Sequence, residues 1–241
     1  MLNNNKAMGL IFPNSFDAHV ARMVKLRAMA SLPFASRYRL VDFVLSSMSN
    51  CGIDNVYILP NRNYLSLMDH LGTGREWDLA RKNGGVHIFP PFAESGNQLA
   101  PGRVGGLHNI LRVLKDSKEK YVFMADTNMA VNFDFNAMLQ EHIATGADVT
   151  MVGKRGIADG KTLCHFAVKE DENGLATTMS CDYMAPADYT VSMGMFVMKR
   201  QLLIDTIKNL VPHGYYHLER DFLMNLCNAG KMKLNVYHFE G

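Results

Sequence analysis

The sequence predicts an α/β protein with a mostly parallel sheet covered by helices. Short apolar runs typical of buried strands alternate along the chain with segments whose apolar residues recur at helical spacing. The 241 residues, of which 48% are apolar and 20% are charged, suffice for a sizeable globular core. Because no internal repeat and no low-complexity linker divides the chain, we expect one domain over residues 1–241.

In the first half of the chain the alternation is regular. The strand predicted to end at Asp126 is expected to be fully buried. Gly146 is expected to cap the C-terminus of the helix predicted at 135–145, because glycine adopts the left-handed conformation that ends many helices. The predicted strands are 7–12, 56–59 and 121–125, and the predicted helices are 38–50, 63–71, 107–114 and 135–145.

The second half is less regular, and one earlier segment is expected to be irregular. Strands are predicted at 148–152, 165–169, 177–181, 193–198 and 233–239, and helices at 201–210 and 219–228. Segment 72–106 is rich in turn-forming pairs (N-G-G, P-P, S-G, P-G), which favour a long loop. Trp77, the only tryptophan, either anchors this loop on the core or contacts a ligand.

Charge and cysteine content exclude several classes of function. With a net charge of +2 and no Lys/Arg run longer than two, we expect no nucleic-acid partner. The N-terminal apolar run 7–12 is too short for a signal peptide or a membrane span, so no membrane association is expected. The four cysteines lack C-x-x-C spacing, which favours reduced thiols in a cytoplasmic protein.

A basic stretch precedes the helix predicted at 38–50. Arg37 and Arg39 flank Tyr38, and two neighbouring guanidiniums suit a phosphate group. A structural interpretation is equally open, in which Asp42 pairs with Arg39 or with the helix N-terminus.

Motifs along the whole chain resemble a known family. R-A-M-A-S-L-P-F-A-S-R-Y-R-L-V-D-F (27–43) is similar to the R-A-K-P-A-V-P-F-G-G-K-Y-R-L-I-D-F signature of ADP-glucose pyrophosphorylases, also called glucose-1-phosphate adenylyltransferases. The resemblance continues at L-S-S-M-S-N-C-G-I-D-N-V-Y-I-L, G-A-D-V-T, S-M-G-M-F-V and F-E-G. It implies a Rossmann-like nucleotidyltransferase (nucleotide-diphospho-sugar transferase) fold, a mostly parallel mixed sheet with helices on both faces. It also implies a chain that stops before the family's C-terminal left-handed β-helix domain.

The chain departs from the family where phosphate chemistry is expected. At the position of the family's glycine-rich G-G-x-G-T-R-L loop this chain has F-P-N-S-F-D-A-H-V (12–20), which contains no glycine. Asp17 in this segment would place a negative charge beside a bound triphosphate. Met29 stands where the family has a lysine that contacts phosphate. The lysine of the family's E-K-P motif is also absent.

Other site positions of the family survive in part, as the resemblance implies. Asp126 matches one of two aspartates that hold Mg²⁺, so we regard it as a vestigial metal ligand. Arg37 occupies the position of an effector-binding lysine, with Arg39 beside it, and both are candidates for an effector phosphate. The nucleotide- and sugar-site remnants are Asn61, Trp77, Gly105, Asp126, Ser192, Met193 and Gly194.

These departures favour a regulatory, non-catalytic GlgD-type subunit of glucose-1-phosphate adenylyltransferase in bacterial glycogen biosynthesis. We expect no catalytic residue and no cofactor for this chain, a hetero-oligomer with the catalytic subunit, and a sugar-phosphate effector. Two alternatives stay open. One is an active, Mg²⁺-dependent enzyme that converts ATP and glucose 1-phosphate to ADP-glucose and pyrophosphate. The other is a sugar-phosphate-binding sensor module.

Overall fold

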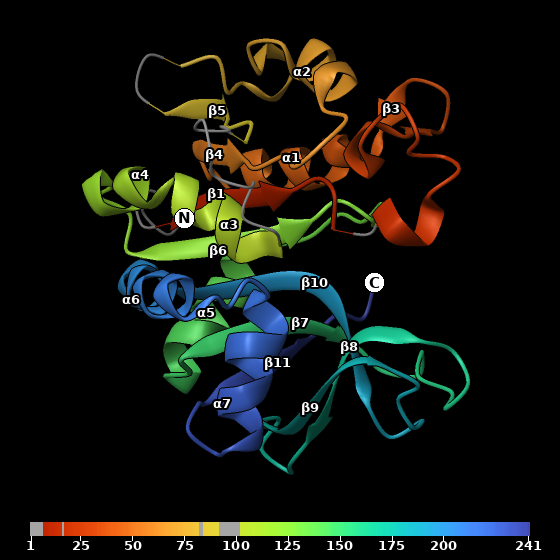
Figure 1. The fold of residues 1–241 in the computed structure, drawn as a ribbon, viewed down its shortest axis with the longest axis vertical. Helices are drawn as coiled ribbons and strands as arrows, with labels where there is room; N and C mark the ends of the chain where they lie inside the picture. The colour runs from red at the N-terminus through yellow and green to blue at the C-terminus, as the bar shows by residue number, and fades with distance from the viewer. Residues whose placement is uncertain (1–6, 16, 82–83, 92–101) are drawn as a thin grey trace. The chain divides into compact units, whose positions relative to one another are not determined.

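The computed structural model describes residues 7–15, 17–81, 84–91 and 102–241. The chain divides into two compact units, whose helices and strands are shown in Figure 1. Unit 1 comprises residues 1–100 and 109–136, and unit 2 comprises residues 101–108 and 137–241. The expectation of a single domain stays a prediction.

Unit 1 is built on four parallel strands in the order β6-β1-β4-β5. Every residue of β1 and of β6 is buried, as their continuous apolar runs predict for a parallel sheet. Phe12 pairs with Asp126 in the register of β1 and β6, so the two strands end side by side. The strands are β1 (Ala7–Phe12), β4 (Asn55–Ile58), β5 (Gly85–Ile88) and β6 (Tyr121–Asp126).

Helix α1 (Leu40–Asn50) packs closely on the centre of this sheet. A Cβ atom at Gly9 of β1 would lie 2.6 Å from Met48 Sδ of α1, so glycine is what allows this approach. The remaining elements of unit 1 are short, and two of them form a hairpin. They are η1 (Asp17–Val20), η2 (Met29–Ser31), the β2 (Pro33–Phe34) and β3 (Tyr38–Arg39) pair, α2 (Leu65–Leu71), η3 (Arg75–Trp77) and α4 (Leu111–Asp116).

Unit 2 has a mixed sheet. β11 is parallel to β7, whereas β10 is antiparallel to both β7 and β8, and β8 is antiparallel to β9. The strands are β7 (Val149–Lys154), β8 (Cys164–Glu170), β9 (Ala176–Tyr183), β10 (Thr190–Lys199) and β11 (Leu234–His238). The helices of this part are α3 (Gly102–Asn109), α5 (Phe135–Thr145), α6 (Arg200–Leu210), η4 (Val211–His213), the π-helical η5 (Leu218–Met224) and α7 (Asn225–Asn228).

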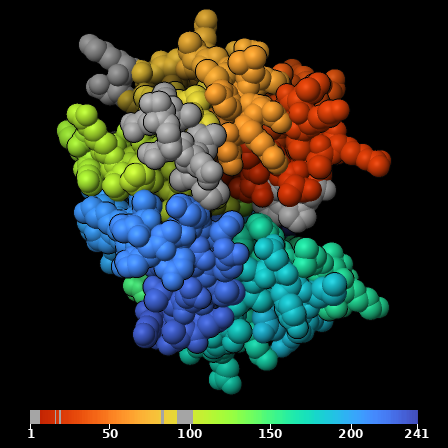
Figure 2. All heavy atoms as spheres, viewed as in Figure 1, coloured from red at the N-terminus to blue at the C-terminus, as the bar shows by residue number. Residues whose placement is uncertain are grey.

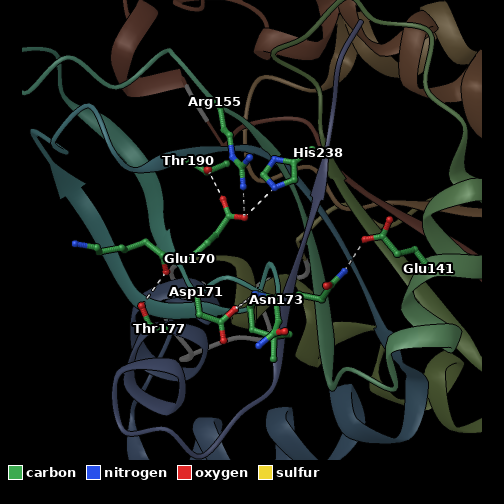
Figure 3. A network of polar contacts seen from close by, with 11 residues as sticks. Glu141, Arg155, Glu170, Asp171, Asn173, Thr177, Thr190 and His238 are labelled. Carbon is green, nitrogen blue, oxygen red and sulfur yellow. Dashed lines mark hydrogen bonds and ion pairs between the residues drawn. The ribbon is translucent and has the colours of Figure 1, made fainter.

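A nearly buried carboxylate ties several strands of unit 2 together, as Figure 3 shows. Glu170 of β8 accepts hydrogen bonds from Thr190 of β10, from Arg155 Nη2 at 3.0 Å and from His238 Nε2 of β11 at 2.8 Å. Only 7% of its side chain is exposed, so each of these donors offsets the cost of burying the charge.

The predicted α/β class and the mostly parallel, mixed sheet are confirmed. Several local expectations differ. Segment 72–106 is not wholly irregular, since it contains η3, strand β5 and the start of α3; its residues 82–83 and 92–101 lie outside the described residues. Helix α1 begins at Leu40 because Tyr38 and Arg39 pair with β2. The expected helix 219–228 is π-helical up to Met224.

Within the described residues, no helix is both long enough and apolar enough to cross a membrane. All four cysteines are free, namely Cys51, Cys164, Cys181 and Cys227.

Candidate functional site

The loop after β1 is closed by its own side chains. The Asp17 carboxylate is 1% exposed, and its Oδ2 accepts from Asn14 Nδ2 at 2.7 Å and from Arg62 Nε at 3.3 Å. Its Oδ1 accepts from the backbone N–H of Met29 at 3.0 Å. The sequence suggested that Asp17 would only repel a phosphate. The structure places the carboxylate inside the loop, bound to donors from three segments.

Ser15 of the same loop is hydrogen-bonded to Asp126. Its hydroxyl donates to Asp126 Oδ1 at 2.5 Å, and Asp126 is 2% exposed at the end of β6. A Mg²⁺ ion prefers several hard oxygen ligands. Among the described residues, no group of three or more His, Cys, Asp or Glu side chains could hold a metal ion. The role of Asp126 as a vestigial Mg²⁺ ligand therefore stays a prediction, and we derive no chemical step through a metal.

Asn61 lies beside this loop. Its backbone N–H donates to Asn14 Oδ1 at 2.8 Å, and Asn14 Nδ2 donates in turn to the carbonyl of Arg62 at 3.1 Å. The segment that follows β4 is thus joined to the segment that follows β1. The carboxyl ends of β1, β4 and β6 form one cluster of polar side chains, as expected for neighbouring parallel strands.

The structure gives Arg37 and Arg39 separate partners. Arg37 is fully exposed on the turn between β2 and β3, where its Nη2 donates to the Tyr38 hydroxyl at 2.9 Å. Arg39 Nη1 donates to the carbonyl and hydroxyl of Ser66 in α2, at 2.5 and 2.8 Å. The Arg39 backbone N–H donates to Asp42 Oδ2 at 2.9 Å, which agrees with the structural interpretation. The Arg37 guanidinium carbon also lies over the Tyr38 ring, 5.0 Å from its centroid, and contact of Arg37 with an effector phosphate stays a prediction.

Trp77 contacts two helices of unit 1, α1 and α2. Its carbonyl accepts from the Ser49 hydroxyl of α1 at 2.6 Å, and its ring meets His70 of α2 edge-on at 5.8 Å between centroids. His70 Nε2 is in turn 2.6 Å from Asp42 Oδ1. These contacts support Trp77 as the anchor of its loop, while contact with a ligand stays a prediction.

In unit 2, Ser192, Met193 and Gly194 form an irregularity in β10. The pairing register with β7 shifts between Ser192 and Phe196, and Gly194 has a φ of +67°. The Ser192 hydroxyl accepts the Gly194 backbone N–H at 3.1 Å. A β-bulge re-aims side chains at the point where it interrupts the ladder, so this segment could present a hydroxyl to a sugar.

Gly105 lies buried within α3 of unit 2, two residues from an ion pair that sequence reasoning did not identify. Arg103 Nε lies 2.8 Å from Glu219 Oε1, with 6% and 7% of the two side chains exposed. The α3 N-terminus is fitted tightly against residue 216, since a Cβ at Gly102 would lie 2.3 Å from the Tyr216 carbonyl oxygen.

Sequence reasoning also missed the contribution of Asn14 and Arg62 to the β1 loop. A signal existed, because both residues follow predicted strands, and the carboxyl ends of neighbouring parallel strands share one edge of the sheet. The spacing of residues along the chain did not indicate that these donors would bind an internal carboxylate.

An α/β sheet with polar side chains gathered at the carboxyl ends of its parallel strands is typical of proteins that bind ligands at that edge. Residues 25–239 match the model of the nucleotidyl transferase family, and the chain belongs to that family.

Among curated proteins, the chain is similar to two called "Glycogen biosynthesis protein GlgD". It is 34% identical to that of Geobacillus stearothermophilus over 89% of the chain and 53% of the relative, and 35% identical to that of Bacillus subtilis (strain 168) over 64% and 45%. It is also 29% identical to the glucose-1-phosphate adenylyltransferase of Bacillus subtilis (strain 168), over 98% of the chain and 62% of that protein. The chain spans about half the length of these GlgD relatives.

Proposed function

We propose that this chain acts in glycogen biosynthesis as a regulatory, non-catalytic GlgD-type subunit of glucose-1-phosphate adenylyltransferase. The similarity to proteins named GlgD supports the pathway. The observation that carries the regulatory role is the closed loop after β1, in which Asp17 and Ser15 are bound within unit 1.

A nucleotidyl transfer site must gather backbone N–H groups and cations around a triphosphate. Here the Met29 N–H and the Arg62 guanidinium, from two other segments, contact the Asp17 carboxylate of the loop instead. A protein whose fold is intact but whose donors bind its own carboxylate can still function by binding another protein. We therefore propose a catalytic glucose-1-phosphate adenylyltransferase subunit as the partner.

The proposal extends to an effector and a compartment. Arg37 is the proposed contact for a phosphorylated sugar, since its guanidinium is exposed on the β2–β3 turn. The four free cysteines support a reducing, cytoplasmic location. We assign no cofactor to this chain, and Mg²⁺ would serve the active partner.

Co-expression tests the proposal. The chain, produced from its intact gene together with the catalytic subunit of the same organism, should elute with it as a mixed oligomer in size-exclusion chromatography. The mixed oligomer should differ from the catalytic subunit alone in its response to a sugar phosphate. Two linked sites typically couple by about 1–3 kcal/mol, which corresponds to about 5- to 150-fold in apparent affinity.

The variant Arg37→Ala provides the internal comparison. It should preserve the mixed oligomer and reduce the difference in effector response, because the Arg37 side chain is exposed and contacts Tyr38 within its own turn. The regulatory function is ruled out if the two proteins neither co-elute nor change one another's kinetics.

A further inference from the structure

The Asp17 carboxylate is bound in the manner of an anionic ligand. Its two oxygens receive one guanidinium N–H from Arg62, one side-chain amide N–H from Asn14 and one backbone N–H from Met29, at 3.3, 2.7 and 3.0 Å. A cation combined with side-chain and backbone amides is the donor set with which proteins hold carboxylates and phosphates. Asp17 is 1% exposed, so the protein buries the carboxylate almost completely.

The donors are held in place by contacts that do not involve the Asp17 side chain. Asn14 Oδ1 accepts the Asn61 N–H at 2.8 Å, which fixes the amide against the segment after β4. The Ala30 N–H donates to the Pro13 carbonyl at 3.2 Å, which fixes the turn that carries Met29. The site should therefore keep its shape when the carboxylate is removed.

The third donor, Arg62, lies in a segment that is fixed in the same way. The Ala28 N–H donates to the Asn63 carbonyl at 3.0 Å, and Asn63 Nδ2 donates to the Val24 carbonyl at 3.0 Å. Figure 2 shows the chain around residues 20–39 and around 61–71 lying next to each other at the surface of unit 1. The Arg62 side chain is 59% exposed, so the cation that binds the buried carboxylate is itself accessible to solvent.

We propose that Asn14, Met29 and Arg62 form a preformed oxyanion-binding site, which is occupied by the chain's own Asp17 carboxylate. An external carboxylate or phosphoryl group must displace a competitor that is attached to the same loop. Tethering gives such a competitor a high effective concentration. The site is thus kept closed to small oxyanions, and loss of the Asp17 carboxylate opens it. This inference does not depend on the regulatory role or on the identity of a partner.

A simpler role for Asp17, as a hydrogen-bonded strut, predicts only a loss of stability on substitution. The oxyanion site predicts in addition that a small anion can replace the missing carboxylate. The full chain carrying Asp17→Ala is the test, with sodium formate and inorganic phosphate as probes and sodium chloride at equal ionic strength as the reference. We expect the Tm of the variant to rise by about 2–4 °C once the anion exceeds its Kd about fivefold. The wild type should show no such rise.

Two further variants identify the site of binding. Asp116→Ala removes the same charge from an exposed pair, in which Asp116 Oδ2 lies 3.7 Å from Arg112 Nε, and its Tm should not respond to formate or phosphate. The double variant Asp17→Ala with Arg62→Ala should lose the response of the single variant, because the cation is gone.

The proposal is overturned if Asp17→Ala responds no more than the wild type, or if its response survives the loss of Arg62. Should Asp17→Ala not fold, Asp17→Ser carries the same test, because its shorter side chain also leaves the space of the carboxylate empty for an added anion. A Tm of Asp17→Ser that is indifferent to phosphate likewise overturns the proposal.

Discussion

Polar side chains at the strand ends of unit 1 are bound to one another. Ser15 donates to Asp126, Asn14 accepts from Asn61, and Arg62 donates to Asp17. The sequence allowed Asp126 and Asn61 to be placed at this edge, because each follows a recognisable buried strand. It did not allow Met29 and Arg62 to be predicted as partners of Asp17, because they lie 12 and 45 residues away along the chain.

His142 of α5 provides a prediction at the scale of a single residue. It is buried, and its Nδ1 lies 2.9 Å from the Thr150 hydroxyl of β7. Burial, followed by the positive charge of Lys199, lowers the pKa of His142 from 6.5 to about 4. The folded protein therefore binds fewer protons than the unfolded chain between these two values, and stability falls as the pH falls through this window.

From about pH 7 to about pH 5, His142 should remove about 2 kcal/mol from the free energy of unfolding. Urea denaturation at a series of pH values measures this loss. His142→Asn, which keeps a polar partner for Thr150, should flatten the dependence. The exposed His108 serves as control, and His108→Asn should preserve the wild-type slope. Equal slopes for wild type and His142→Asn would refute the assignment.

At the scale of elements, the predicted helices and strands agree with the structure where the local sequence pattern is strong. The strands expected at 7–12 and 121–125 coincide with β1 and β6, because long buried apolar runs are hard to mistake. Glycine-capped α5 ends as expected, with Gly146 at a φ of +61°. The two-residue strands β2 and β3 are too short to give a periodic pattern.

Tertiary contacts decide the elements that the sequence did not indicate. Strand β5 pairs along its length with β4, and it was missed because Gly84 and Gly85 precede its apolar residues and suggested a loop. The π-helical turn of η5 has no local signature in the sequence, since it differs from an α-helix only in that each backbone hydrogen bond spans one residue more.

The bulge in β10 gives a prediction at this scale. Gly194 has a φ of +67°, a conformation that costs an alanine about 1–2 kcal/mol. Gly194→Ala should lower the free energy of unfolding by about that amount, measured by urea denaturation. Gly194→Asn should cost less, because asparagine tolerates the left-handed region better than alanine does. If both variants cost the same, the backbone conformation is not what selects glycine here.

At the scale of the whole molecule, motifs spread from residue 27 to the C-terminal F-E-G indicated the family, and the match over residues 25–239 confirms it. Such motifs are read along the chain and need no tertiary information. Whether the chain performs the chemistry of its enzymatic relatives depends instead on a few positions in the loop after β1, on Met29 and on Asp126.

The final prediction is that the purified chain, supplied with ATP, glucose 1-phosphate and Mg²⁺, forms no ADP-glucose. One preorganised donor aimed at developing charge contributes about 10²–10³ in rate, and the thioether of Met29 cannot supply the cation that the resemblance implies at this position. The Met29 N–H and the Arg62 guanidinium are in addition bound to Asp17, and Asp126 accepts from Ser15. Pyrophosphate release is the measurement, with the catalytic subunit as positive control. Release above the protein-free background that disappears in Asp126→Ala would establish that the chain is an enzyme.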